Sequence, residues 1–162
     1  MHDALARIYV DTNNDPSNFL KVNKYYNSKV VGEHCEHTHP DLAIQAYRRD
    51  WGKCDEEMIM LTNRIFMYRV LATYVVERED APLWTRVLNQ KNQHRQKVVD
   101  LLIDITKEHV ADFSKAKKAR VWKAVCHFTL KVKEFKVAHL CADQAISISS
   151  KHKDDIIEMY RT

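Results

Sequence analysis

Turn-forming residues are scarce in this chain, which has only 2 glycines and 3 prolines among 162 residues. An all-β domain needs many more glycine and proline turns, and a parallel α/β domain usually needs more glycine at the ends of its strands. Low glycine together with abundant lysine, glutamate, alanine and leucine favours helices instead. The composition therefore predicts an all-α fold.

Long apolar runs are also lacking. No stretch of about 18 uninterrupted apolar residues occurs, so we expect no insertion into a membrane. The first ten residues, MHDALARIYV, contain an early acid and no long apolar core, unlike a secretory signal. Four cysteines without such a signal indicate reduced thiols in the cytosol.

A strong charge of one sign is missing as well, since the net charge is only +4. That value does not predict nucleic-acid binding, which usually shows a concentrated basic face. Two basic clusters stand out, and either could contact an acidic partner or phosphates, although a solvated ridge of loops is the simpler explanation. Their candidate partner-binding residues are Lys115, Lys117, Lys118, Arg120 and Lys123, with Lys131, Lys133 and Lys136 as a possible extension of the same face. A helical-repeat RNA binder remains an alternative, which steep salt-dependent RNA binding would favour.

Hydrophobic periodicity and breakers predict about ten short helices. The first covers 2–12, with Leu5, Ile8 and Tyr9 as its apolar stripe. Another begins with Ser28 as N-cap and ends at His39, because Pro40 disfavours helix at the residue before it. The later ones are expected near 40–50, 55–63, 64–80 (apolar on most of its circumference), 82–88, 94–110 (one amphipathic helix), 119–130, 133–146 and 153–161.

Short helices cannot bury a face alone and must stack on neighbours. The stretches Leu83–Leu88 and Val121–Cys126 share an apolar-Trp-x-x-Val-apolar pattern, offset by the 38 residues from Trp84 to Trp122. A period near 40 built from helix pairs is typical of an α-solenoid. On periodicity alone, a compact helical bundle remains an equal alternative.

Several residues that could serve chemistry are more simply explained as core. Trp84 and Trp122 have Val and Leu neighbours at helical spacing, so we expect them to fill the interior rather than bind a ligand. Cys126 and Cys141 lie in apolar stripes, where free cysteine behaves as a small hydrophobe. We further expect close helix approach at Ala43, Ala46 and Ala138.

The densest group of metal-ligand residue types is His34, Cys35, His37 and His39, with Cys54 nearby. On a helix His34 and His37 share one face, whereas Cys35 and His39 lie on another. One zinc ion, which needs four tetrahedral ligands, cannot readily be reached from both faces. A small metal- or thiol-dependent enzyme built on this cluster is the alternative to histidines exposed at a helix end.

No glycine-rich phosphate loop, nucleophile elbow or zinc-protease motif occurs. Cys126 and His127 are adjacent, which places them about 100° apart on a helix and poorly set as nucleophile and base. We therefore predict that the chain is not an enzyme and uses no cofactor.

The stretches NNDPSNFLKVNKYYNSKVVGEHCE and HPDLAIQAYRRDWGKCDEEMI resemble clathrin heavy chain. The matching residues are Asn13, Asn14, Pro16, Phe19, Leu20, Asn23, Tyr25, Tyr26, Ser28, Val30, Val31, Gly32, Cys35, Glu36, Pro40, Leu42, Ala43, Ala46, Tyr47, Cys54 and Asp55. YVVEREDAPLWTRVL resembles the next stretch of the same leg.

The second half resembles a later leg repeat of the same family. Its matching residues are Lys115, Ala116, Arg120, Trp122, Lys123, Val125, Cys126, Lys133, Glu134, Phe135, Ala138 and Cys141. We therefore expect two non-contiguous leg regions, 1–108 and 109–162, joined near 106–116 and continuing one solenoid.

The resemblance implies an all-α solenoid of short antiparallel helix hairpins, acting mechanically in coat assembly for vesicle transport and endocytosis. It implies a cytoplasmic location, at coated pits and coated vesicles. The implied partners are other clathrin heavy chain legs and clathrin light chain, with neither nucleic acid nor membrane insertion. Nothing in the chain resembles the family's β-propeller or its trimerisation segment, so the resemblance does not extend to adaptor binding or autonomous cage assembly. We expect the open ends of the stack to favour self-association.

Overall fold

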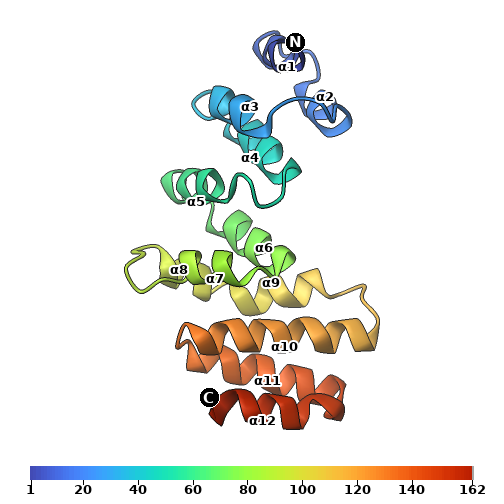
Figure 1. Cartoon of the computed structure of the whole chain (residues 1–162), viewed down its shortest axis with the longest axis vertical. Helices are drawn as coiled ribbons and strands as arrows, with labels where there is room; N and C mark the ends of the chain where they lie inside the picture. Colours follow the sequence, from blue (N-terminus) through green and yellow to red (C-terminus); the bar gives the residue numbers. More distant parts are fainter. Residues whose placement is uncertain (162) are drawn as a thin grey trace. The chain divides into compact units, whose positions relative to one another are not determined.

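The chain is a succession of short helices in the computed structural model, which describes residues 1–161 (Figure 1). No strand occurs among these residues. The elements are α1 (His2–Asp11), α2 (Pro16–Val22), α3 (Ser28–Cys35), α4 (Pro40–Arg49), α5 (Asp55–Arg64), α6 (Tyr68–Arg78), α7 (Ala81–Val87), α8 (Arg95–Val99), α9 (Leu102–His109), α10 (Lys115–Lys131), α11 (Phe135–Ile148), the 3₁₀ turn η1 (Ser150–His152) and α12 (Lys153–Arg161). The predicted all-α fold of short helix hairpins is confirmed.

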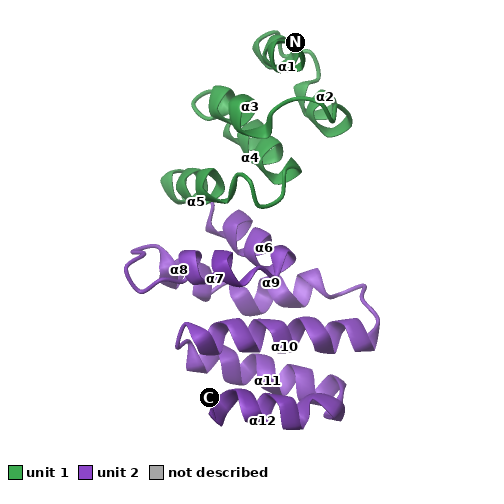
Figure 2. Ribbon diagram, in the orientation of Figure 1, with its two compact units in different colours: residues 1–66 green, residues 67–162 purple. Residues whose placement is uncertain are grey.

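The helices form two compact units, unit 1 (Met1–Phe66) and unit 2 (Met67–Thr162), coloured separately in Figure 2. Unit 1 is built around the α3–α4 hairpin, with α2 and α5 packed on α4 and α1 packed on α2 and α3. Unit 2 is built around the α10–α11 hairpin, with α7 and α12 on α10 and α9 on α11. In the same unit α6 contacts α7, α8 and α9. Each unit therefore buries its helix faces against neighbouring helices.

The α3–α4 hairpin is closely packed because α3 carries a glycine at the contact. A Cβ atom built on Gly32 would lie 2.1 Å from Cε1 of Tyr47. Tyr47 of α4 is fully buried, as are Ala43 and Ala46 on the same helix. Glycine at position 32 thus allows an aromatic ring to lie directly on the backbone of the facing helix.

The structure corrects the predicted boundaries of α3. Asn27, not Ser28, is the N-cap, since its side chain accepts hydrogen bonds from the backbone N–H groups of Lys29 and Val30. Ser28 is instead the first helical residue and is buried. The helix ends at Cys35 and residues 36–38 form a turn, so the predicted helix to His39 is wrong. Pro40 disfavours helix at His39, but α3 already ends at Cys35, before this constraint applies.

The N-terminal stripe is also wrong in its burial. Leu5 and Ile8 are exposed, whereas Ala6 and Val10 are the buried residues of α1. Tyr9, the third residue of the predicted stripe, is half-buried and stacks on Phe19 of α2 with ring centroids 4.1 Å apart. The turn-forming stretch after α1 adopts left-handed backbone at Asn13 and Asp15, as its composition predicts. The helix that follows it, α2, starts at Pro16 and was missed.

Unit 2 confirms the interior role of both tryptophans. Trp84 on α7 stacks on Phe128 of α10 with ring centroids 5.2 Å apart, and Trp122 is buried in α10. Cys126 and Cys141 are fully buried in the α10–α11 hairpin, as their apolar stripes predict. Leu71, Ala72, Val75 and Val76 are buried around much of α6, which confirms the expectation for that helix.

The predicted amphipathic helix 94–110 is two helices, α8 and α9, separated at Asp100 and Leu101. Both Val98 and Val99 are buried, so α8 buries two adjacent positions where the periodic pattern assigns only one. Arg95 of α8 pairs with Glu134 and donates to the carbonyl of Val132 at the α10–α11 turn. Tertiary contacts of α8 therefore override the single amphipathic face.

Candidate functional site

The histidine and cysteine cluster does not converge on a point. His34 Nε2 lies 2.7 Å from Asp11 Oδ1, and His37 and His39 are exposed in or beside the turn after α3. Cys35 is fully buried and so is Cys54. Within residues 1–161, no group of three or more His, Cys, Asp or Glu side chains could hold a metal ion. The arrangement fits histidines at a helix end and a cysteine in the core.

The cysteines lack the environment of a reactive thiol. Burial raises the pKa of Cys35 and of Cys54 to about 11, and it raises the pKa of Cys126 and Cys141 as well. Burial lowers the pKa of His127. A nucleophilic cysteine needs a lowered pKa and a protonated neighbour. Cys126 and His127 have the opposite shifts.

We expect the four thiols to resist a thiol reagent at about pH 8 in the native chain and to react after denaturation. An unfolded thiol titrates near 9.0, whereas Cys35 and Cys54 titrate at about 11 in unit 1. Between these values the unfolded chain loses protons that the native chain keeps, so the free energy of unfolding should fall as pH rises through this window. Urea unfolding at several pH values, with reagent titration of native and denatured samples, checks both. Fast labelling of the native chain would contradict the burial of these groups.

The predicted basic residues lie at two ends of one helix. Lys115, Lys117, Lys118 and Arg120 occupy the first turns of α10, whereas Lys131 ends that helix and Lys133 and Lys136 follow at the turn into α11. A 17-residue helix spans about 25 Å. That the second group extends the face of the first therefore stays a prediction. Lys123 is engaged elsewhere, in an ion pair with Asp155 of α12.

Lys115, Lys117 and Arg120 line a concave site of about 630 Å³, here named the basic hollow. It lies between the start of α10 and the segment from the end of α11 through η1. Its lining residues are Ser114, Lys115, Ala116, Lys117, Arg120, Ile148, Ser149, Lys151 and His152. Sequence reasoning missed Lys151 and His152, although the run SSKHK marks a basic, polar segment.

Lys131 and Lys133 line a smaller concave site of about 350 Å³, here named the turn hollow. Lys131, Val132 and Lys133 form one wall, and residues 88–91 with Thr85 form the other. Lys91 adds a third lysine that the sequence did not single out. Neither hollow is lined by a carboxylate or a cysteine.

Comparison with known proteins gives the family. The sequence model described as "Clathrin: Region in Clathrin and VPS" matches residues 1–99, more than half of the chain. The chain belongs to this family. Clathrin heavy chain 1 of Arabidopsis thaliana is 48% identical over 103 residues, which are 64% of this chain and 6% of that relative.

Two further clathrin relatives agree. The probable clathrin heavy chain 1 of Caenorhabditis elegans is 43% identical over 111 residues, or 68% of this chain and 6% of the relative. Clathrin heavy chain 2 of Homo sapiens is 41% identical over 111 residues, or 68% of this chain and 7% of the relative. The chain therefore spans only a small fraction of the length of the clathrin heavy chains it matches. The resemblance to clathrin heavy chain is confirmed, with the family model covering residues 1–99, whereas the likeness of residues 109–162 to a later leg repeat stays a prediction.

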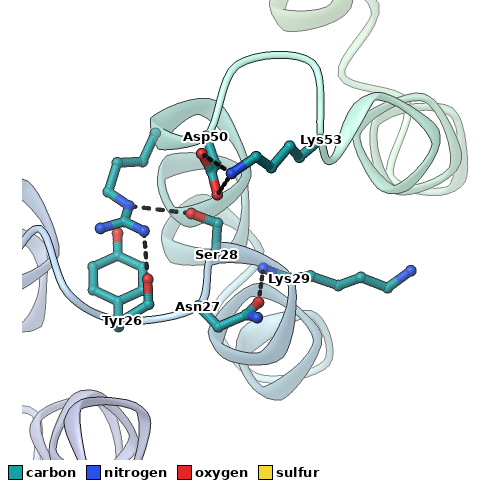
Figure 3. A network of polar contacts seen from close by, with 7 residues as sticks. Tyr26, Asn27, Ser28, Lys29, Asp50 and Lys53 are labelled. Atoms are coloured by element: carbon teal, nitrogen blue, oxygen red, sulfur yellow. Dashed lines mark hydrogen bonds and ion pairs between the residues drawn. The ribbon is translucent and has the colours of Figure 1, made fainter.

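Within the clathrin-family region, a polar network fixes the entry into α3 (Figure 3). The Arg49 guanidinium lies 3.9 Å from the centroid of the Tyr26 ring. It donates to Ser28 Oγ at 3.1 Å and to the carbonyls of Asn23 and Tyr26. The end of α4 is thereby tied to the segment that leads into α3, and Tyr26 is buried with its hydroxyl donating to the carbonyl of Leu20.

Replacing Arg49 by alanine is expected to cost about 2 kcal/mol of unfolding free energy, because it removes three hydrogen bonds and a ring stack from a half-buried position. Arg49→Lys keeps the charge but not the planar fork, so it should lose most of the same stability. Urea unfolding followed by circular dichroism measures both. Arg7→Ala, on the exposed side of α1, is the matched control and should change little. Full stability in Arg49→Lys would show that charge alone matters.

No helix among the described residues is both long and apolar enough to cross a membrane. The buried side chains instead belong to helix–helix contacts inside each unit.

Proposed function

We propose that the chain is a structural segment that acts by surface contact in coat assembly during intracellular vesicle transport and endocytosis. The observation that carries this proposal is its 48% identity over 103 residues to a clathrin heavy chain. The hairpin architecture supports it, because the interior side chains pack helix against helix. Among the described residues, no group of His, Cys, Asp or Glu side chains could hold a metal ion. A role without catalysis, on the cytoplasmic face of coated pits and coated vesicles, follows from the same relatives.

The proposed partners are other clathrin heavy chain legs. Unit 1 exposes several large apolar side chains that suit contact with another helical surface, namely Val22, Tyr25, Trp51, Met60 and Phe66. Solvent exposure of this kind also supports the expected self-association of the chain. Light scattering over a concentration series tests that property directly.

We propose that residues 109–162 continue the solenoid begun by residues 1–108, as a later repeat would. Contact between α9 and α11 supports this, because these helices lie on opposite sides of the boundary and pack together inside unit 2. The α10–α11 hairpin supports it too, since it repeats the antiparallel helix pairing of α3 and α4.

The turn hollow is our proposed contact for an acidic protein segment such as clathrin light chain. Lys91, Lys131 and Lys133 line it, and no carboxylate of residues 1–161 forms an ion pair with any of them. Lys136 lies exposed near the same turn. These four charges can attract a negative segment without first breaking an internal pair.

The alternatives lack comparable support. A metal or thiol enzyme would need ligands or a reactive thiol that the cluster around Cys35 does not supply. An RNA binder would need one continuous basic face, whereas Lys123, midway along α10, is paired with Asp155.

Co-sedimentation tests the proposed function. Purified full-length chain is mixed with clathrin heavy chains under conditions in which coats assemble, and the pellet is assayed for the chain, with and without light chain. We expect the chain in the pellet, and a helical protein of equal size and charge in the supernatant. A specific clathrin contact is refuted if both proteins are recovered equally in the pellet, or if neither protein is found there.

A further inference from the structure

The basic hollow concentrates positive charge that the chain does not neutralise. Four lining side chains are basic, Lys115, Lys117, Arg120 and Lys151, and His152 lies beside them. No aspartate or glutamate lines the hollow. Lys115, Arg120 and Lys151 form no ion pair with any of residues 1–161.

Several other basic residues of unit 2 form ion pairs. Arg69 pairs with Glu108 at 2.5 Å, Arg95 pairs with Glu134, and Lys123 pairs with Asp155. Asp155 is the acid near His152, and its pKa is lowered by the hydrogen bond from Lys123 and then by charge. This carboxylate, which interacts with His152, is therefore already paired with Lys123. The hollow keeps a net positive potential, which attracts anions.

The remaining polar groups of the hollow are hydroxyls. Ser114, the N-cap residue of α10, makes no capping hydrogen bond with its side chain, and its hydroxyl is a potential donor to a bound anion. Ser149 faces it from the end of α11. Lys117 is held in place, with Nζ 3.6 Å from the centroid of the Phe113 ring.

A hollow lined by lysine, arginine and hydroxyl groups, without carboxylates, suits a phosphate ligand. Each phosphate offers three acceptor oxygens and nearly two negative charges, and it pairs with Arg, Lys and hydroxyl groups together. Four cations around about 630 Å³ exceed what one phosphate would neutralise. We propose that the basic hollow binds a ligand carrying two or more phosphate groups, either a free polyphosphate or the headgroup of a phosphoinositide lipid.

The test uses the full chain at physiological salt with two probes. Inositol hexakisphosphate represents the free polyphosphate, and phosphatidylcholine vesicles with a minor share of a bisphosphorylated phosphatidylinositol represent the lipid. Calorimetry and vesicle flotation measure binding. We expect the double variant Lys115→Glu/Arg120→Glu to weaken binding at least about tenfold, since two charge-assisted contacts are replaced by repulsion.

The control is Lys21→Glu/Lys24→Glu, which makes a matching reversal of two charges on exposed residues of unit 1. It should bind like the original chain, and circular dichroism should show all variants folded. Binding to inositol hexakisphosphate but not to the vesicles supports the site and identifies a free polyphosphate as its ligand. Binding to the vesicles that inositol hexakisphosphate competes away supports the site and identifies the lipid headgroup. The proposal is overturned if neither probe binds, or if the control variant loses as much affinity as Lys115→Glu/Arg120→Glu. It is also overturned if a polyglutamate peptide, tested as a third probe, binds more tightly than the phosphate probes. None of these results bears on the clathrin contacts proposed above.

Discussion

Replacing Gly32 by valine is expected to cost unit 1 about 3 kcal/mol or more of its unfolding free energy. The added Cβ would lie 2.1, 2.5 and 2.6 Å from three ring atoms of Tyr47, closer than any real contact. The ring cannot easily move aside, because the Tyr47 hydroxyl donates to Glu36 Oε1 at 2.6 Å and Arg64 Nη2 donates to Glu36 Oε2 at 2.6 Å. Displacing Tyr47 would break this chain of contacts and open the α3–α4 interface.

The sign of this effect opposes helix propensity. A glycine inside a helix normally gains about 1 kcal/mol on replacement by alanine, because the backbone loses less entropy. Gly32→Ala should nevertheless destabilise, since even one methyl group meets the ring. Urea unfolding by circular dichroism gives both numbers. Glu33→Val, one residue along on the exposed side of α3, introduces the same side chain and should change stability by about 0.5 kcal/mol or less.

A double variant separates the contact from other causes. If the ring of Tyr47 is what rejects a side chain at position 32, then Gly32→Ala should cost much less in a Tyr47→Ala background than in the original chain. Additive losses in that cycle would show that Gly32 is required for another reason, and a Gly32→Val chain as stable as the original would contradict the packing of α3 on α4.

The hairpin architecture could be predicted from the sequence because it depends on local signals. Scarce glycine, short periodic segments and the repeated tryptophan pattern each indicate stacked helix pairs, and both tryptophans are indeed buried. The role of Gly32 could not be derived in this way. Its reason is the ring of Tyr47, fifteen positions further on and on another helix.

Other misses share that cause. Leu5 and Ile8 form a good apolar stripe, but burial in α1 is decided by which side α2 and α3 cover. The break at Asp100 contains neither glycine nor proline, so no local signal marks it. The basic hollow joins residues 114–120 to residues 148–152 only because α10 and α11 run antiparallel. Sequence patterns give faces and ends of helices, whereas sites of this kind require knowing which ends meet.

Trp84→Ala is expected to destabilise unit 2 by about 3–5 kcal/mol, the usual cost of emptying a buried tryptophan site. Trp84 is only 1% exposed and bridges α7 to α10 through its stack on Phe128. Trp51→Ala is the matched control, because it removes the same indole from a side chain that is 53% exposed. That change should cost less than about 1 kcal/mol. Similar losses for the two variants, measured by urea unfolding, would place Trp84 outside the core.

Trp84→Phe should be far milder than Trp84→Ala, for two reasons that the structure supplies. Phenylalanine can keep the ring stack on Phe128. It also removes an N–H group that is buried without an acceptor among residues 1–161. Such an unpaired donor costs about 1–3 kcal/mol of desolvation, and its removal offsets part of the lost volume. A Trp84→Phe chain as unstable as Trp84→Ala would mean that the indole nitrogen has a partner, for instance an ordered water, and that the α7–α10 contact depends on a hydrogen bond as well as on packing.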